Sequence, residues 1–173
     1  VDDVTAPSTP TIADATGECS VTVTAPSATD NCAGSVTGTT TDPTTYNAQG
    51  SYTITWTFDD GNGNTSTATQ NVIVDDVTAP STPTIADATG ECSVTVTAPS
   101  ATDNCAGSVT GTTTDPTTYN AQGSYTITWT FDDGNGNTSA ATQNVIVDDV
   151  TAPSAPTIAD ATGECSVTVT APT

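Results

Sequence analysis

Apolar and polar residues alternate most clearly between residues 51 and 60. The apolar members of this run are Tyr52, Ile54, Trp56 and Phe58, and threonines separate them. A period of two is typical of a β-strand with one buried face and one solvated face. The turn sequence Asp-Gly-Asn-Gly-Asn follows, and a second apolar-rich run occupies residues 65–74. The two runs therefore predict a β-hairpin.

Shorter stretches of the same kind precede this hairpin. Residues 19–24 alternate as Cys-Ser-Val-Thr-Val-Thr and predict a strand, while the Pro-containing residues 7–12 predict a short edge strand. We expect residues 25–31 to form a loop. No segment has helical periodicity. Six or seven short strands separated by closely spaced turns predict an all-β, immunoglobulin-like sandwich.

The whole pattern is a 73-residue repeat. The heptapeptide Val-Asp-Asp-Val-Thr-Ala-Pro begins at Val1, Val74 and Val147, and the first two copies differ only at Thr67 and Ala140. The repeat predicts tandem modules at residues 5–77 and 78–150 and a partial module at 151–173, with residues 1–4 as the end of a preceding module. We expect the sequence to be part of a longer array.

The charge of the chain is entirely negative. It contains 20 Asp and Glu residues and no Lys, Arg or His. Binding to nucleic acids or anionic lipids depends on cationic side chains, so neither partner is expected. Catalysis is also not expected, because general acid–base chemistry would depend on carboxylates alone. No apolar run is long enough to span a membrane within this segment.

Large apolar residues are few in each module, and a domain of this size buries a small core. We therefore expect additional stabilisation from disulfides, metal ions, Pro-containing turns or neighbouring modules. The first expectation is a disulfide within each module, Cys19 with Cys32 and Cys92 with Cys105, because the members of each pair are close in sequence. A bridge between modules stays open, because an immunoglobulin topology puts the two cysteines of one module at opposite poles. Free thiols are a further alternative.

Paired aspartates suggest a site for calcium. Oxygen ligands in turns suit Ca²⁺ better than a transition metal. In an immunoglobulin topology the end of one module faces the loops of the next, so we expect carboxylates to meet across the joint, with Asp14 or Glu18 as additional candidates. The candidate calcium ligands are Asp59, Asp60, Asp75, Asp76, Asp103, Asp132, Asp133, Asp148 and Asp149. A solvated acidic surface without metal is the alternative.

Two strings carry a family resemblance. They are Cys-Ser-Val-Thr-Val-Thr-Ala-Pro-Ser-Ala-Thr-Asp-Asn-Cys and Gly-Ser-Tyr-Thr-Ile-Thr-Trp-Thr-Phe-Asp-Asp-Gly-Asn-Gly-Asn-Thr. They resemble the hyalin-repeat (HYR-like) branch of the immunoglobulin-like fold, and are similar to the tandem repeats of giant Bacteroidetes surface adhesins, including the flavobacterial gliding-motility type exported by type IX secretion. The resemblance implies an extracellular stalk or fibre on a bacterial surface and indicates no ligand. Residues 65–74 lack the cysteine of the animal repeat, so its disulfide pattern is not implied.

These observations predict a structural repeat segment of an extracellular adhesin stalk. One alternative is a multivalent array that binds surface polysaccharide, with affinity rising with repeat number. Another is self-assembly into an extracellular filament through edge strands and acidic joints. In each case the neighbouring repeats of the same chain are the first partners.

Overall fold

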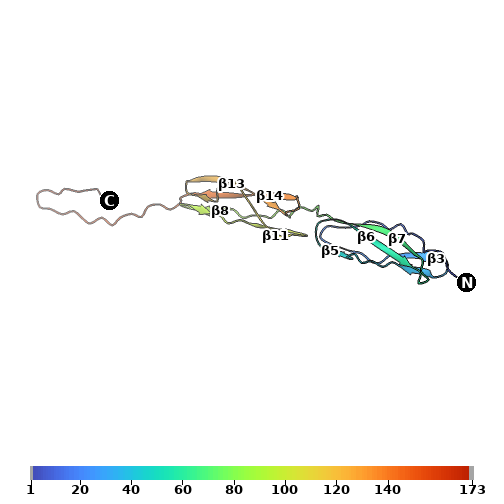
Figure 1. The fold of residues 1–173 in the computed structure, drawn as a ribbon. Coiled ribbons are helices and arrows are strands. Elements are labelled where there is room, and N and C mark those ends of the chain that lie inside the picture. The colour runs from blue at the N-terminus through green and yellow to red at the C-terminus, as the bar shows by residue number, and fades with distance from the viewer. Residues whose placement is uncertain (1, 172–173) are drawn as a thin grey trace.

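The computed structural model describes residues 2–171, which contain strands and no helix. The strands form two packed units that lie end to end along an elongated molecule (Figure 1). The strands of the first module are β1 (Ala15–Gly17), β2 (Val21–Thr22), β3 (Ser27–Asp30), β4 (Gly34–Thr37), β5 (Thr45–Tyr46), β6 (Gly50–Asp59) and β7 (Thr65–Val74). Those of the second are β8 (Ala88–Gly90), β9 (Val94–Thr95), β10 (Ser100–Asp103), β11 (Gly107–Thr110), β12 (Thr118–Tyr119), β13 (Gly123–Asp132) and β14 (Thr138–Val147).

Each module is an immunoglobulin-like β-sandwich, as the alternation predicts. In the first module β6 and β7 form the long antiparallel hairpin, with Ile54 opposite Gln70, and β1 pairs in parallel with the end of β7. The short pairs β2–β5 and β3–β4 supply the opposing layer. The second module repeats these pairings between the equivalent residues.

The core of each module lies between these layers. In the first module one cluster contains Ile54, Trp56 and Phe58 from β6, together with apolar residues of β2, β3, β4 and β7. Trp56 is 2% exposed, and its Nε1 donates a hydrogen bond to Gln70 Oε1 at 3.1 Å. The buried indole therefore keeps a polar partner, which burial of an N–H requires. The second module has its own core cluster of the equivalent residues.

Tyr52 closes the turn before β6. Its hydroxyl donates to the Ala48 carbonyl at 2.9 Å, four residues upstream, and its ring stacks on Tyr46. A hydroxyl that bonds back to the upstream backbone is the geometry of a tyrosine corner, which fixes the entry into the penultimate strand of immunoglobulin-like domains.

Three local predictions are wrong in detail. The Pro-containing segment 7–12 forms no strand and is held beside β3 by the Ser8 N–H, which donates to the Thr29 carbonyl at 2.8 Å. The predicted loop 25–31 contains β3, because Ala28 is a buried core residue opposite Val36. The strand expected at 19–24 is reduced to β2, since Cys19 lies in a bend.

The third copy differs from the other two. Residues 151–171 form no strand and are exposed, although their sequence nearly repeats that of the first two copies. In the complete modules β1 pairs with β7 and β2 with β5, and residues 151–171 contain no counterpart of β5 or β7. Strand formation in this segment thus depends on partners distant in the sequence.

Candidate functional site

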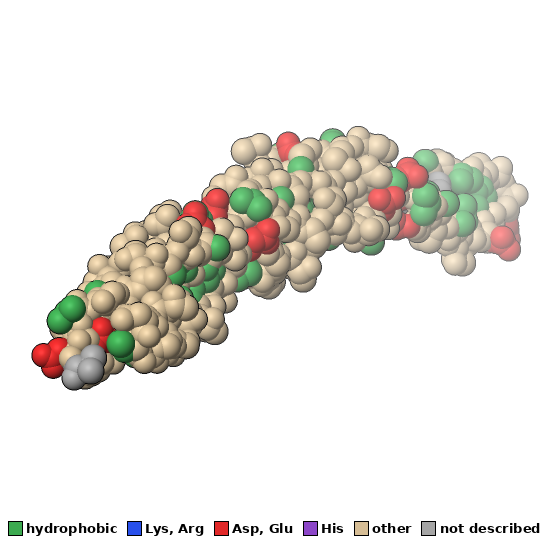
Figure 2. Space-filling model, turned by 90° about the vertical axis from the view of Figure 1, so that its right-hand side faces the viewer, with side chains coloured by type: hydrophobic (Ala, Val, Ile, Leu, Met, Phe, Trp, Pro, Cys, Tyr) green, Lys and Arg blue, Asp and Glu red, His purple; other side chains and the backbone are tan. Residues whose placement is uncertain are grey.

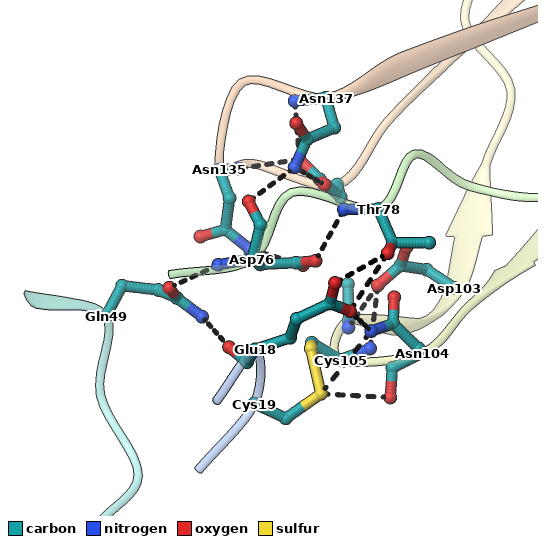
Figure 3. The surroundings of a disulfide bond; sticks show 12 residues. Glu18, Cys19, Gln49, Asp76, Thr78, Asp103, Asn104, Cys105, Asn135 and Asn137 are labelled. Atoms are coloured by element: carbon teal, nitrogen blue, oxygen red, sulfur yellow. Dashed lines mark hydrogen bonds between the residues drawn. A yellow bond between two sulfur atoms is a disulfide. The ribbon is translucent and has the colours of Figure 1, made fainter. Parts of the chain in front are cut away.

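A disulfide joins the two modules. Cys19 of the first module bonds to Cys105 of the second, with 5.0 Å between their Cα atoms and a sequence separation of 86 (Figure 3). The expected pairs Cys19–Cys32 and Cys92–Cys105 are therefore wrong, and the bridge between modules is the one that forms. Cys32, Cys92 and Cys165 are free thiols.

The reason for this pairing is the position of the cysteines along the module. Cys19 follows β1, whose end pairs with the end of β7, so it lies at the pole that faces the second module. Cys32 lies in the β3–β4 turn at the other pole, beside Asp3 and Asp60. Two cysteines at opposite poles cannot approach to the roughly 4.4–6.8 Å Cα separation that a disulfide needs. Stacking the modules instead brings Cys19 to the second module's counterpart of Cys32.

Hydrogen bonds surround this disulfide. The Glu18 carboxylate accepts from the Thr78 hydroxyl at 3.0 Å on Oε1 and 2.9 Å on Oε2, and from the side-chain amide of Asn104. Glu18 belongs to the first module, while Asn104 belongs to the β10–β11 turn of the second. A charge-assisted hydrogen bond thus crosses the joint next to the covalent link.

Three carboxylates gather on the second module's side of the joint. Asp76, Asp103 and Asp133 come from the linker, the end of β10 and the β13–β14 turn, and they offer oxygens that lie within 4.8 Å of one another. We call this group the joint cluster. The linker is held over it because the Asn137 side-chain amide donates to the Asp76 carbonyl at 2.8 Å. Three close carboxylates without a neighbouring cation repel one another, so this arrangement could hold a metal ion.

The hydrogen bonds of the joint cluster leave one buried oxygen without a partner. Asp103 accepts the Cys105 and Ala106 N–H groups on Oδ1, but its Oδ2 is buried and has no partner. An ionised carboxylate oxygen buried without a donor or cation is costly. A bound cation would satisfy it, so the donor set fits a metal on an observation independent of the number of acidic residues.

The protonation state of Asp133 also fits this role. Desolvation raises its pKa, but hydrogen bonds from the Asn137 side chain and from the N–H groups of Asn135 and Asn137 outweigh it, so the pKa lies below its ordinary value. Gly134 and Gly136 adopt φ of 85° and 104° and allow the turn to direct these N–H groups at one carboxylate. Asp133 thus remains ionised, the form that a hard cation needs.

An equivalent group lies at the N-terminal end of the first module. Asp3, Asp30 and Asp60 occupy the positions of Asp76, Asp103 and Asp133, and their oxygens also lie within 4.8 Å of one another. We call this group the N-terminal cluster. The Asp3 and Asp30 Oδ2 atoms are buried without partners. Sequence reasoning missed Asp3 and Asp30, although the repeat relates them directly to Asp76 and Asp103, two residues that it did select.

The other predicted ligands are not brought together. Within residues 2–171, none of the three-residue acidic groups that could hold a metal includes Asp59, Asp75, Asp132, Asp148 or Asp149. Asp59 and Asp132 instead accept the Gly61 and Gly134 N–H groups at 2.8 Å in their turns. Asp75 and Asp148 are exposed to solvent. Asp14 accepts from Asn71 in its own module and takes no part in the joint.

Burial of one repeated position reflects the assembly of the joint. Asp76 is 3% exposed, whereas Asp3 is half-buried and Asp149 is exposed. Asp76 has folded modules on both sides, and the other two have one each. A further group of Glu18, Asp76 and Cys105 is equally close, but the Cys105 sulfur is in the disulfide and is not a thiolate ligand. The joint cluster is therefore the better candidate.

Comparisons with known proteins identify no family: no protein-family model and no curated protein matches the chain. The part of the chain that the structure describes has no helix long and apolar enough to cross a membrane. Figure 2 shows acidic side chains in separate groups along the elongated surface, in keeping with clusters at the module ends.

Proposed function

We propose that this chain is a repeat segment of an extracellular adhesin stalk or fibre that extends from a bacterial cell surface. The observation that carries the proposal is the Cys19–Cys105 disulfide, which links consecutive modules rather than stabilising each one separately. A covalent bond between consecutive modules keeps the joint closed when the array is pulled, which a stalk under tension requires. Structural disulfides also persist mainly in oxidising, extracellular compartments.

Calcium is the metal that this function favours. The joint cluster and the N-terminal cluster offer carboxylate oxygens, and hard oxygen donors in flexible loops suit Ca²⁺. Millimolar calcium outside cells suffices for sites of modest affinity. Ions at these positions would screen the acidic residues where modules meet and stiffen the joint. The resemblance to HYR-like repeats of Bacteroidetes adhesins supports the stalk and indicates no metal.

Two measurements test the proposal. Antibodies raised against the chain are expected to label intact cells of the bacterium that encodes it, and labelling restricted to permeabilised cells would contradict a surface stalk. Small-angle X-ray scattering of the purified chain in calcium and in EDTA is expected to show a rod whose maximum dimension is greater and better defined in calcium. An unchanged profile and an unchanged melting temperature would contradict the metal.

A repeated groove favours a second candidate, a multivalent glycan-binding array. Residues 39–42 with Thr55 and Thr57 line an open groove of about 450 Å³, and residues 112–115 with Thr128 and Thr130 line one of about 410 Å³. Threonine hydroxyls can bond to sugar hydroxyls, although neither groove offers an aromatic ring for stacking. A binding array predicts that affinity for polysaccharide rises steeply with repeat number, whereas a stalk predicts no affinity at any length.

A further inference from the structure

Each module has one cysteine at each pole. Cys19 lies at the end of the first module that faces the second, and Cys105 lies at the near end of the second module. Cys32 and Cys92 are the repeat counterparts of Cys105 and Cys19 respectively, and they occupy the two outer ends of this pair of modules. Both are exposed thiols. Every copy thus presents to its following neighbour the sulfur that Cys19 presents to Cys105.

The chain between the two cysteines of a module runs along the module. From Cys92 it passes through β9, which pairs with β12, and then β10, which ends at Asp103 beside the joint cluster. The segment from Cys92 to Cys105 therefore crosses from one pole to the other in a single extended passage. A disulfide at each end would make it a continuous covalent path through the module.

From this arrangement we infer that, in an array that continues the repeat, every pair of consecutive modules is joined by a disulfide. These disulfides and the short chain segments between them form a continuous covalent path, here called the disulfide ladder. Tension follows this path and does not load the rest of each module. Cys92 bonds to the next copy's counterpart of Cys105, at position 178 in the register of the repeat. The load then passes from one disulfide along the chain between Cys105 and Cys92 to the next disulfide. The rest of each repeat lies outside the shortest path. This mechanical role rests on the proposed stalk function.

The consequence is an array that hardly lengthens even if its modules unfold. A whole reduced repeat extends to about 250 Å, whereas the segment from Cys92 to Cys105 extends to about 45 Å. The ten-residue strand β13 (Gly123–Asp132), which runs between the same two poles, is about 33 Å long. Unfolding therefore lengthens each oxidised repeat by about 10 Å, whereas it lengthens a repeat without these disulfides by about 200 Å. When a pulling force unfolds an oxidised module, the array therefore lengthens very little.

Closing each rung is a two-electron oxidation. The Cys92 thiol and its partner lose two protons and two electrons as the S–S bond forms. A dithiol oxidant in its disulfide form, protein or small molecule, accepts them and leaves as two thiols by exchange through a mixed disulfide. Closing Cys19–Cys105 requires the same chemistry.

Single-molecule stretching of the 173-residue chain between its two ends tests directly whether tension passes through the Cys19–Cys105 disulfide. With the Cys19–Cys105 bond intact, the interval between these two cysteines does not extend, so the fully stretched oxidised chain is expected to be about 300 Å shorter than the reduced chain. Cys105→Ser should abolish that difference, while the matched control Cys32→Ser should leave it unchanged. Disulfides within modules would instead give a difference of about 90 Å, and that result or none would overturn the inference.

A four-copy array of the repeat tests the ladder. Each interior module is expected to release about 10 Å on unfolding under oxidising conditions and about 200 Å after reduction. Release of about 200 Å per module from the oxidised array would overturn the ladder. This outcome does not depend on where the protein resides, so it is distinguishable from a failure of surface labelling, which would refute the stalk function alone.

Discussion

Gln49 holds Asp76 in place at the exit of the first module. Its Oε1 accepts the Asp76 N–H at 2.8 Å, and its Nε2 donates to the Glu18 carbonyl at 2.8 Å. Gln122 makes the equivalent bonds to Asp149 and Glu91 at 2.8 and 2.7 Å, although the segment that follows is exposed and has no strands. The direction in which the linker leaves is therefore set by the module that precedes it.

Replacing Gln49 with alanine is expected to loosen the joint. The change leaves the Asp76 N–H without its partner, at a cost of about 1–2 kcal/mol in joint stability. The distribution of distances between spin labels on the two modules should broaden in Gln49→Ala. Gln122→Ala removes the same contacts where no folded module follows and serves as the control. Equal inter-module distance distributions in Gln49→Ala and the unmodified chain would show that Gln49 does not orient the linker.

The Asp103→Asn variant tests the joint cluster as a metal site. In EDTA the melting temperature should stay the same or rise, because one of three mutually repelling charges is removed. In calcium the thermal stabilisation should shrink, and calorimetric titration should detect one site per chain in place of two, since the N-terminal cluster is intact. Asp75→Asn makes the same charge change at an exposed position. If both variants behave alike, calcium does not bind at the joint cluster.

A methyl group at Gly38 should destabilise the first module. A Cβ there would lie 2.9 Å from the Phe58 ring, which is completely buried and cannot move away. We expect Gly38→Ala to lower the free energy of unfolding by about 1–3 kcal/mol. Ser35→Ala, on the exposed face of β4 (Gly34–Thr37), should change it little. Chemical denaturation of the two variants compares them, and equal midpoints would refute this account of the core.

The free energy of unfolding should fall in alkaline solution because Tyr46 and Tyr119 ionise less readily in the folded state than in the unfolded state. Burial, followed by the charge of Asp42 or Asp115 and by the neighbouring tyrosine, raises both pKa values above the ordinary value of 10.0. Because the unfolded state ionises first, their stabilising contribution is complete below about pH 10 and is lost as pH rises through the folded pKa. Tyr46→Phe with Tyr119→Phe should flatten the alkaline decline of the unfolding free energy. A slope identical to that of the unmodified chain would assign the decline to other groups.

The long hairpin was predictable because its signal is local. Alternation over residues 51–60 and the Asp-Gly-Asn-Gly-Asn turn specify β6 (Gly50–Asp59) and β7 (Thr65–Val74) without reference to the rest of the chain. The short strand β3 (Ser27–Asp30) was not predictable, since Ala28 and Asp30 have weak intrinsic strand preference and the strand is ordered by contacts with β4 and the 7–12 segment.

The joint was only partly predictable for a related reason. Asp76, Asp103 and Asp133 lie near one another as an immunoglobulin topology predicts, because that topology fixes which ends of strands meet. The disulfide was predicted wrongly because Cys19 and Cys32 are close in sequence yet lie at opposite ends of the module in space. Closeness in sequence does not show at which end of the module a cysteine lies. The partner of Cys19 therefore depends on how the modules stack.

Consecutive modules are covalently joined through Cys19 and Cys105, and one engineered cleavage site tests this linkage. The chain has no Lys or Arg, so Val77→Lys at the 66%-exposed linker position creates a single site for trypsin between the modules. After cleavage with free thiols blocked, the two halves are expected to migrate together in a non-reducing denaturing gel and to separate on addition of reductant. Halves that separate without reductant would show that Cys19 and Cys105 do not join the modules.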